Sequence, residues 1–232
     1  MPNDWISRTT YIAHFDILGF KSRMDNDDGS LPIFILKETI DEIIEGLQKG
    51  IQNFSDSIEY THYADTFIIY SKTEDSSGYP ALVRAAKNLI TSCILNRLPA
   101  RGAIAYGEVS FGHDDRIIIG KAALESYTYC EDQDWIGLLL APTACRQLKS
   151  IGIEPIRHGF INKDVELKTS ALRNKYVYAY RFINGSTSYR CPQLSMLQEM
   201  HDRAPEDVRH KYQKTINFIK KHYTVHKIEP QN

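Results

Sequence analysis

The order in which strand-like and helix-like patterns follow one another constrains the fold of this chain more than any other feature. A strand-like apolar run covers residues 10–18, a helical spacing of apolar residues covers 33–51, and two short strand-like runs then flank a turn at Ala64-Asp65. A second helical pattern covers residues 80–95, and a further strand-like run covers 101–111. This β-α-β-β-α-β order predicts an α+β fold in which helices cover one face of a mostly antiparallel sheet.

The patterns beyond residue 112 are shorter. They predict a strand at 116–119, a helix over 121–131, an apolar segment over 135–140, a short helix ending at 148, strands near 153 and over 176–182, and a helix over 205–221. The chain has 232 residues, a size typical of one domain with a small appendage. We expect residues 1–185 to form the main domain and residues 186–232 a C-terminal helical extension of it.

Composition excludes several classes of protein. The chain has 28 basic and 29 acidic residues, so neither a nucleic-acid-binding surface nor a charged disordered tail is indicated. Its four cysteines are far apart and unpaired in sequence, which argues against a zinc site or a disulfide framework. No apolar run approaches the roughly 20 residues that span a bilayer. We therefore expect a soluble, cytoplasmic protein with neither a nucleic-acid nor a membrane partner.

Three short segments carry the candidate chemistry. Residues 15–20 read Phe-Asp-Ile-Leu-Gly-Phe and place Asp16 at the end of a strand, and Asp65 lies in a hairpin turn about fifty residues later. The third segment begins at Arg101 and has two glycines in a strand. In this order, over roughly the first 125 residues, the segments resemble the catalytic core of class III adenylate and guanylate cyclases. The resemblance implies a ferredoxin-like core and identifies residues 1–185 as a nucleotidyl cyclase domain.

The resemblance also implies a metal site. In that family the strand-end acid, the backbone carbonyl of the next residue and the hairpin acid bind two divalent ions, and these positions correspond to Asp16, Ile17 and Asp65. Cyclisation turns the ribose 3′-hydroxyl into a nucleophile that attacks the α-phosphorus of a nucleoside triphosphate. Hard oxygen ligands suit Mg²⁺ or Mn²⁺ for this reaction. His14 and His62 lie near the acids in the sequence and are interpreted as structural residues.

Substrate contacts are expected in two places. In the family, backbone amides of the turn after the first strand meet phosphate oxygens, which corresponds here to Phe20 and Lys21, with Arg23 as a further candidate cation. The base-reading position falls on Thr61, and Tyr60 or Tyr63 is expected to close the space beside a small base.

This sequence departs from the purine-specific cyclases at four positions. Thr61 replaces the lysine and Ile117 the acid that read a purine, while Leu124 and Thr128 replace the Asn and Arg that steady the transition state. Arg101 is the residue that we assign to catalysis in their place. Other candidates on the predicted helix are Lys121, Glu125, Ser126 and Tyr127.

The opening hexapeptide, the Arg-Gly start of the third strand and the altered purine positions are similar to the pyrimidine cyclases of bacterial anti-phage Pycsar systems. That resemblance implies a homodimer that converts UTP, and CTP second, to the cyclic monophosphate, which a separate effector protein reads. Two alternatives stay open. One is a purine cyclase with an unconventional base pocket, and the other is an inactive cyclase-like domain that binds nucleotides or dimerises.

Overall fold

A single sheet forms the centre of the protein. The computed structural model describes residues 5–20, 33–73, 78–112, 117–162, 167–169, 172, 178–180 and 191–223. The sheet has the strand order β2-β3-β1-β4-β6-β8-β7, and β5 pairs with β4 beside this path. The strands are β1 (Ile6–Ile17), β2 (Ile58–Tyr63), β3 (Thr66–Ser71), β4 (Ala100–Gly112), β5 (Ile117–Ile119), β6 (Gly137–Leu140), β7 (Phe160–Asn162) and β8 (Tyr178–Tyr180). Among these described strands, every pairing is antiparallel except that of β4 with β6.

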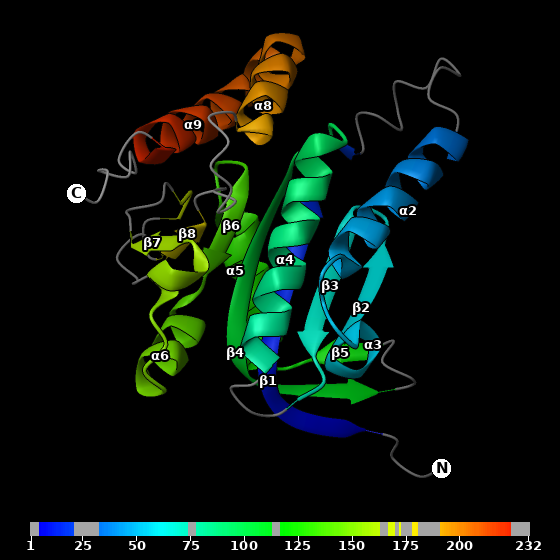
Figure 1. Cartoon of the computed structure of the whole chain (residues 1–232), viewed down its shortest axis with the longest axis vertical. Coiled ribbons are helices and arrows are strands. Elements are labelled where there is room, and N and C mark those ends of the chain that lie inside the picture. Colours follow the sequence, from blue (N-terminus) through cyan, green and yellow to red (C-terminus); the bar gives the residue numbers. More distant parts are fainter. Residues whose placement is uncertain are drawn as a thin grey trace, which may run out of the picture.

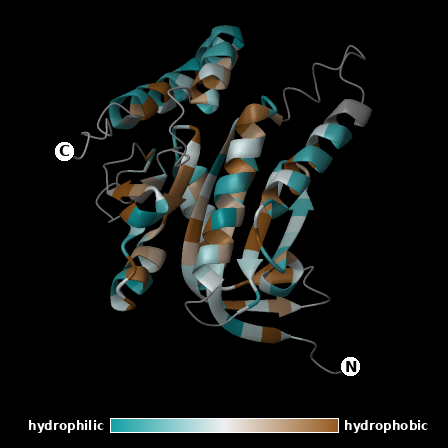
Figure 2. Cartoon of the chain, viewed as in Figure 1, coloured by the Kyte–Doolittle hydropathy of each residue, from teal (hydrophilic) through white to brown (hydrophobic). Residues whose placement is uncertain are grey.

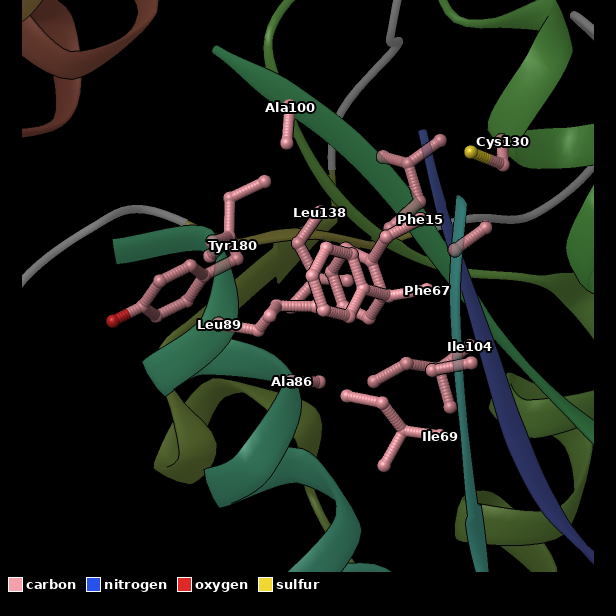
Figure 3. Packing of buried hydrophobic residues seen from close by; sticks show 14 of the residues in the cluster. Phe15, Phe67, Ile69, Ala86, Leu89, Ala100, Ile104, Cys130, Leu138 and Tyr180 are labelled. Atoms are coloured by element: carbon pink, nitrogen blue, oxygen red, sulfur yellow. The ribbon is translucent and has the colours of Figure 1, made fainter. Parts of the chain in front are cut away.

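One face of the sheet is covered by α2 (Ile33–Gln48) and α4 (Gly78–Leu95), with α4 lying across the central strands (Figure 1). Side chains alternate along β1, so Phe15 points toward α4. Figure 3 shows Phe15 gathered with Phe67, Leu89 and Leu138 in one apolar cluster, and all four are fully buried. A side chain at Gly102 would clash with the Phe15 ring, which explains the glycine after Arg101.

The opposite face of β1 and β4 carries α5 (Lys121–Asp132). The His14 ring meets the Tyr127 ring edge-on at 5.2 Å between centroids, and the Cys130 thiol lies 3.4 Å from the Arg101 carbonyl oxygen. The expected α+β fold is confirmed, with the addition that α5 covers part of the face on which Asp16 lies.

The C-terminal part packs beside α4. Helix α8 (Pro192–Arg203) contacts both α4 and α9 (Glu206–Tyr223) (Figure 1). Figure 2 shows hydrophilic and hydrophobic residues mixed along α8 and α9, as expected of helices with one buried side. Within the described residues, no helix combines the length and hydropathy needed to cross a bilayer.

Most elements lie where the sequence pattern predicts them. The strand predicted near residue 153 is wrong: the backbone there leads into the 3₁₀ helix η1 (Pro155–His158), and Pro155 cannot donate to a strand ladder. Elements that the pattern does not predict are α3 (Phe54–Ser57), β7 and α8, and the predicted short helix is α6 (Pro142–Ser150).

Candidate active site

Asp16 and Asp65 lie at one edge of the sheet. Asp16 is the penultimate residue of β1, and Asp65 follows Ala64 in the turn between β2 and β3. The Ile17 amide donates a hydrogen bond to the Asp65 carbonyl oxygen at 2.9 Å, which fixes the turn against the end of β1. Ala64 has a left-handed φ of 54°, and its carbonyl oxygen lies 2.8 Å from Nε2 of His62. The two acids named by the sequence motifs are therefore neighbours in space.

Arg101 holds Asp16 from the other side. The two residues are cross-strand partners, and Arg101 Nε donates to Asp16 Oδ2 at 2.8 Å. Nη2 donates to the Glu131 carboxylate at 2.7 Å, and Nη1 donates to the backbone oxygens of Glu131 at 2.6 Å and Gln133 at 3.3 Å. The Arg101 side chain is only 8% exposed and that of Asp16 is 16% exposed. The guanidinium is thus turned onto acceptors of its own chain.

The local electrostatics keep His14 neutral. Burial raises the pKa of Asp16, and this outweighs the lowering effect of the adjacent Arg101. Burial lowers the pKa of His14 to about 4, against the opposing influence of Asp16. His14 is therefore uncharged near neutral pH, in agreement with a structural role. A carboxylate whose burial is incompletely compensated gains from a further cation nearby.

The donors at this edge fit a hard divalent ion. The two carboxylates and the Ile17 carbonyl offer only oxygen ligands, which Mg²⁺ and Mn²⁺ prefer. No cluster of three His, Cys, Asp or Glu side chains suited to a metal occurs in the described part of the chain. The set implied by the resemblance contains only two such side chains, and Arg101 contacts just one oxygen of Asp16.

Strand register places the base-binding candidates on opposite faces. Thr61 pairs with Ile68, which pairs with His14, so the exposed Thr61 shares the face of Asp16. Tyr60 lies on the other face, where its ring is 6.2 Å from that of Phe54. The structure does not bring Tyr60 together with the two acids.

Tyr63 does share the face of Asp16. It pairs with Thr66, which is the cross-strand partner of Asp16, and Tyr63 is 83% exposed. Of the two tyrosines considered from the sequence, only Tyr63 therefore offers a ring on the side of the acids.

The remaining sequence-derived candidates divide by environment. Phe20 follows Gly19 at the end of β1 and packs half-buried against the core. Lys21 and Arg23 lie outside the described residues. On α5, Leu124 is 65% exposed, and the half-buried Thr128 donates its hydroxyl to the Leu124 carbonyl oxygen. Glu125 is bound to Thr143.

Other α5 candidates differ in exposure. The Ser126 hydroxyl is buried and donates to the Ala123 carbonyl oxygen. Lys121 and Tyr127 remain exposed, and Ile117 on β5 is 40% exposed.

Three charged residues near the acids are not evident from the sequence. Glu131 binds Arg101, Lys168 Nζ donates to the Glu131 carbonyl oxygen at 2.7 Å, and Lys211 of α9 interacts electrostatically with Asp16. Each is far from the motifs in the sequence, so only the tertiary packing of α5 and α9 reveals them.

Among the comparisons with known proteins, the comparison with solved structures gives matches. No protein-family model matches the chain, and no curated protein sequence matches it. Among solved structures, the catalytic core of a rhodopsin–guanylyl cyclase with converted specificity, in complex with ATPαS, superposes with a TM-score of 0.56 at 11% identity, over 75% of this chain and 97% of that one.

Two further structures agree. A dimeric guanylyl cyclase domain of the RhoGC fusion protein from the aquatic fungus Blastocladiella emersonii superposes with a TM-score of 0.53 at 12% identity, over 75% of this chain and 97% of that one. A bacterial light-regulated adenylyl cyclase superposes with a TM-score of 0.50 at 14% identity, over 86% of this chain and 58% of that one. This chain therefore has the fold of the guanylyl and adenylyl cyclase catalytic domains.

Proposed function

We propose that this protein is a nucleotidyl cyclase that converts UTP, and CTP second, to the 3′,5′-cyclic monophosphate and pyrophosphate. The observation that carries the proposal is the 2.9 Å hydrogen bond from the Ile17 amide to the Asp65 carbonyl oxygen. On a sheet with a cyclase fold, this bond brings together the two aspartates that the motifs single out.

Asp16, Asp65 and the Ile17 carbonyl would hold two divalent ions, Mg²⁺ or Mn²⁺. When bound, such ions acidify the ribose hydroxyl and neutralise the triphosphate. Arg101 keeps the Asp16 carboxylate in one orientation, and Glu131 in turn fixes the guanidinium. In the reaction, the 3′-oxygen forms a bond to the α-phosphorus, the bond to the pyrophosphate oxygen breaks, and the hydroxyl proton leaves to water.

The substrate preference rests on the residues that face the acids. Thr61 stands on the Asp16 face where purine cyclases have a lysine, and Ile117 replaces the acid. A buried purine would leave polar edge atoms unpaired there, at a cost of about 1–3 kcal/mol each. Tyr63 offers an exposed ring on the same face, and stacking of a base on an aromatic ring contributes about 1–3 kcal/mol.

The proposal includes a two-fold homodimer. Tyr63, Leu124 and Tyr127 are large, exposed and carried by elements on the Asp16 side of the sheet. A second copy of the chain would cover them and complete each site, as the cyclase resemblance implies. The product would act as a second messenger for a separate effector in anti-phage defence, and this part of the proposal is supported by the motif resemblance.

Two other functions fit particular observations. A purine cyclase is compatible with the fold, since the solved relatives are guanylyl and adenylyl cyclases. An inactive nucleotide-binding or dimerisation module is favoured by Leu124 and Thr128, which cannot replace Asn and Arg chemically.

The metal role is tested with Asp16→Asn and Asp65→Asn. We expect each to lower cyclic-product formation about 1,000-fold or more, because a lost metal clamp removes several kcal/mol of transition-state stabilisation. Asp65→Asn is the cleaner variant, since the Asp65 side chain makes no hydrogen bond or ion pair with the described residues. EDTA should abolish activity of the native protein.

Asp56→Asn is the matched control, because Asp56 is exposed on α3 and distant from the site in the fold. Product is measured by chromatography with mass detection, and folding by circular dichroism. Near-native turnover of Asp65→Asn would show that the metal assignment is wrong.

A further inference from the structure

The segment that follows α5 connects the candidate site to α9. At its start, the Glu131 carbonyl oxygen accepts hydrogen bonds from both Arg101 and Lys168. Three residues later, the Asp134 carboxylate accepts from Lys214 Nζ at 2.7 Å and lies 3.1 Å from Nε2 of His210. Residues 210 and 214 bracket Lys211 on the helix, so α9 is tethered beside the site at this turn.

Thr215 fixes the register of α9 on the same segment. Its side chain is fully buried, and its hydroxyl accepts from the Ile136 amide at 2.9 Å and lies 2.9 Å from the Ile136 carbonyl oxygen. Lys211 is one helical turn earlier, and side chains four residues apart lie on the same side of a helix. Lys211 is therefore on the side of α9 that packs against the segment before β6.

Lys211 is half-buried, and its ammonium makes no hydrogen bond or ion pair with the described residues. Its charge interacts with four residues: Arg101, Lys168, Asp134 and Asp16. Burial lowers its pKa, Arg101 and Lys168 lower it further, and these effects outweigh Asp134 and Asp16. A positive charge with no hydrogen-bond acceptor among the described residues gains little from the fold, whereas an anionic ligand would supply the acceptor.

We propose that Lys211 binds the phosphate chain of the nucleotide, so that the C-terminal helical pair α8–α9 forms part of the substrate site. The identity of the ligand rests on the proposed function. A nucleoside triphosphate bound at Asp16 and Asp65 would bring its anionic phosphates to this edge of the sheet. Arg101 cannot bind the phosphates in this way, because its guanidinium already donates hydrogen bonds to Asp16 and Glu131. Lys168 adds positive potential on the same side.

The test measures binding of inorganic tripolyphosphate to the full chain by calorimetry in excess Mg²⁺. We expect Lys211→Gln to raise the Kd at least about tenfold, because it removes a charge-assisted hydrogen bond. Lys211→Arg keeps the charge and should stay within about threefold of the native Kd. Lys221→Gln is the matched control, since Lys221 is an exposed lysine of the same helix, and it should bind as the native chain does.

Folding is checked on the same samples. Lys211→Gln should melt no lower than the native chain, because burial, Arg101 and Lys168 together outweigh the attraction of Asp134 and Asp16 for the lysine charge. An unchanged Kd in Lys211→Gln would overturn the inference, and so would a native chain that does not bind tripolyphosphate. Weaker dimerisation of Lys211→Gln with an unchanged Kd would show instead that the lysine pairs with a second copy of the chain.

The outcomes separate this inference from the proposed function. If the native chain forms no cyclic nucleotide but Lys211→Gln still weakens tripolyphosphate binding, the cyclase proposal fails and the phosphate subsite stands. If the chain is an active cyclase and Lys211→Gln retains the native Kd for tripolyphosphate and the native KM for UTP, the subsite fails and the cyclase proposal stands.

Discussion

At the scale of single residues, the ion pair between Arg101 and Asp16 orients the Asp16 carboxylate in the candidate site. The sequence identifies Asp16 through its place after an apolar strand, and Asp65 through its place in a hairpin turn. It assigns Arg101 to direct catalysis, but the structure surrounds this guanidinium with Asp16, Glu131 and Gln133. The pairing of Arg101 with Asp16 follows from strand register only when β1 and β4 are known to be neighbours. Glu131 lies thirty residues after Arg101 on a helix, so the sequence does not indicate its contact with Arg101.

We expect Arg101→Met to lower the free energy of unfolding by about 3 kcal/mol, because it leaves the nearly buried Asp16 carboxylate without its partner. Activity should fall with it, since Asp16 loses its fixed orientation. Urea unfolding measures the stability change, and Arg101→Lys should recover part of it.

Arg97→Met is the control for Arg101→Met. Arg97 pairs with Glu199 at the surface, with its side chain 51% exposed, so its loss should cost less than about 1 kcal/mol. Equal losses in the two variants would contradict the positioning role that we propose for Arg101.

Tyr60 and Tyr63 show what a sequence motif leaves open. Both flank the Thr61 position, and an alternating strand places them three residues apart on opposite faces. The face of each depends on which residue of β3 it pairs with, and this register is set by the two-residue turn at Ala64-Asp65. The structure therefore selects Tyr63 where the sequence allowed either residue.

At the scale of elements, the segments with long periodic patterns were predicted well. The hairpin and the helices near residues 80–95 and 205–221 agree closely with β2, β3, α4 and α9. Strand β8 lies within the strand predicted over 176–182, whereas β7 has three residues, too few for an alternating pattern to be distinguished from a loop. Their positions depend on pairing with each other and with β6.

The attachment of α9 through Asp134 gives a pH prediction. Burial raises the pKa of Asp134, but hydrogen bonds from Lys214 and His210 outweigh it, so the pKa lies below its ordinary value of 3.8. The ionised carboxylate thus stabilises the fold above about pH 4, and this contribution is lost as pH falls through the lowered pKa.

The native chain should therefore be more stable than Asp134→Asn by about 1 kcal/mol at pH 6, and by less at pH 3. Urea unfolding at the two pH values measures the difference. A difference that stays constant or grows toward pH 3 would show that the Asp134 charge does not hold α9 in place.

At the scale of the whole molecule, helices cover the two faces of the sheet unequally. Helices α2 and α4 pack on one face, and α5 covers part of the other, where Asp16, Thr61 and Tyr63 lie (Figure 1). The β-α-β-β-α-β order predicts the cover of the first face, because the pattern of each amphipathic helix requires a face to cover, but it does not predict α5 on the second face. It did not predict that α9 returns to the edge beside Asp16, since the contacts of a terminal helix are not encoded in its own periodicity.

The central claim is that this fold, with these two aspartates, cyclises a pyrimidine nucleotide. The most direct measurement incubates the purified chain with UTP, CTP, ATP and GTP at equal concentrations with Mn²⁺, and identifies each 3′,5′-cyclic product by chromatography with mass detection. We expect cyclic UMP to form fastest, cyclic CMP next, and the purine products slowly. Faster cyclisation of ATP or GTP would contradict the pyrimidine preference, and the absence of any cyclic product would contradict the cyclase account itself.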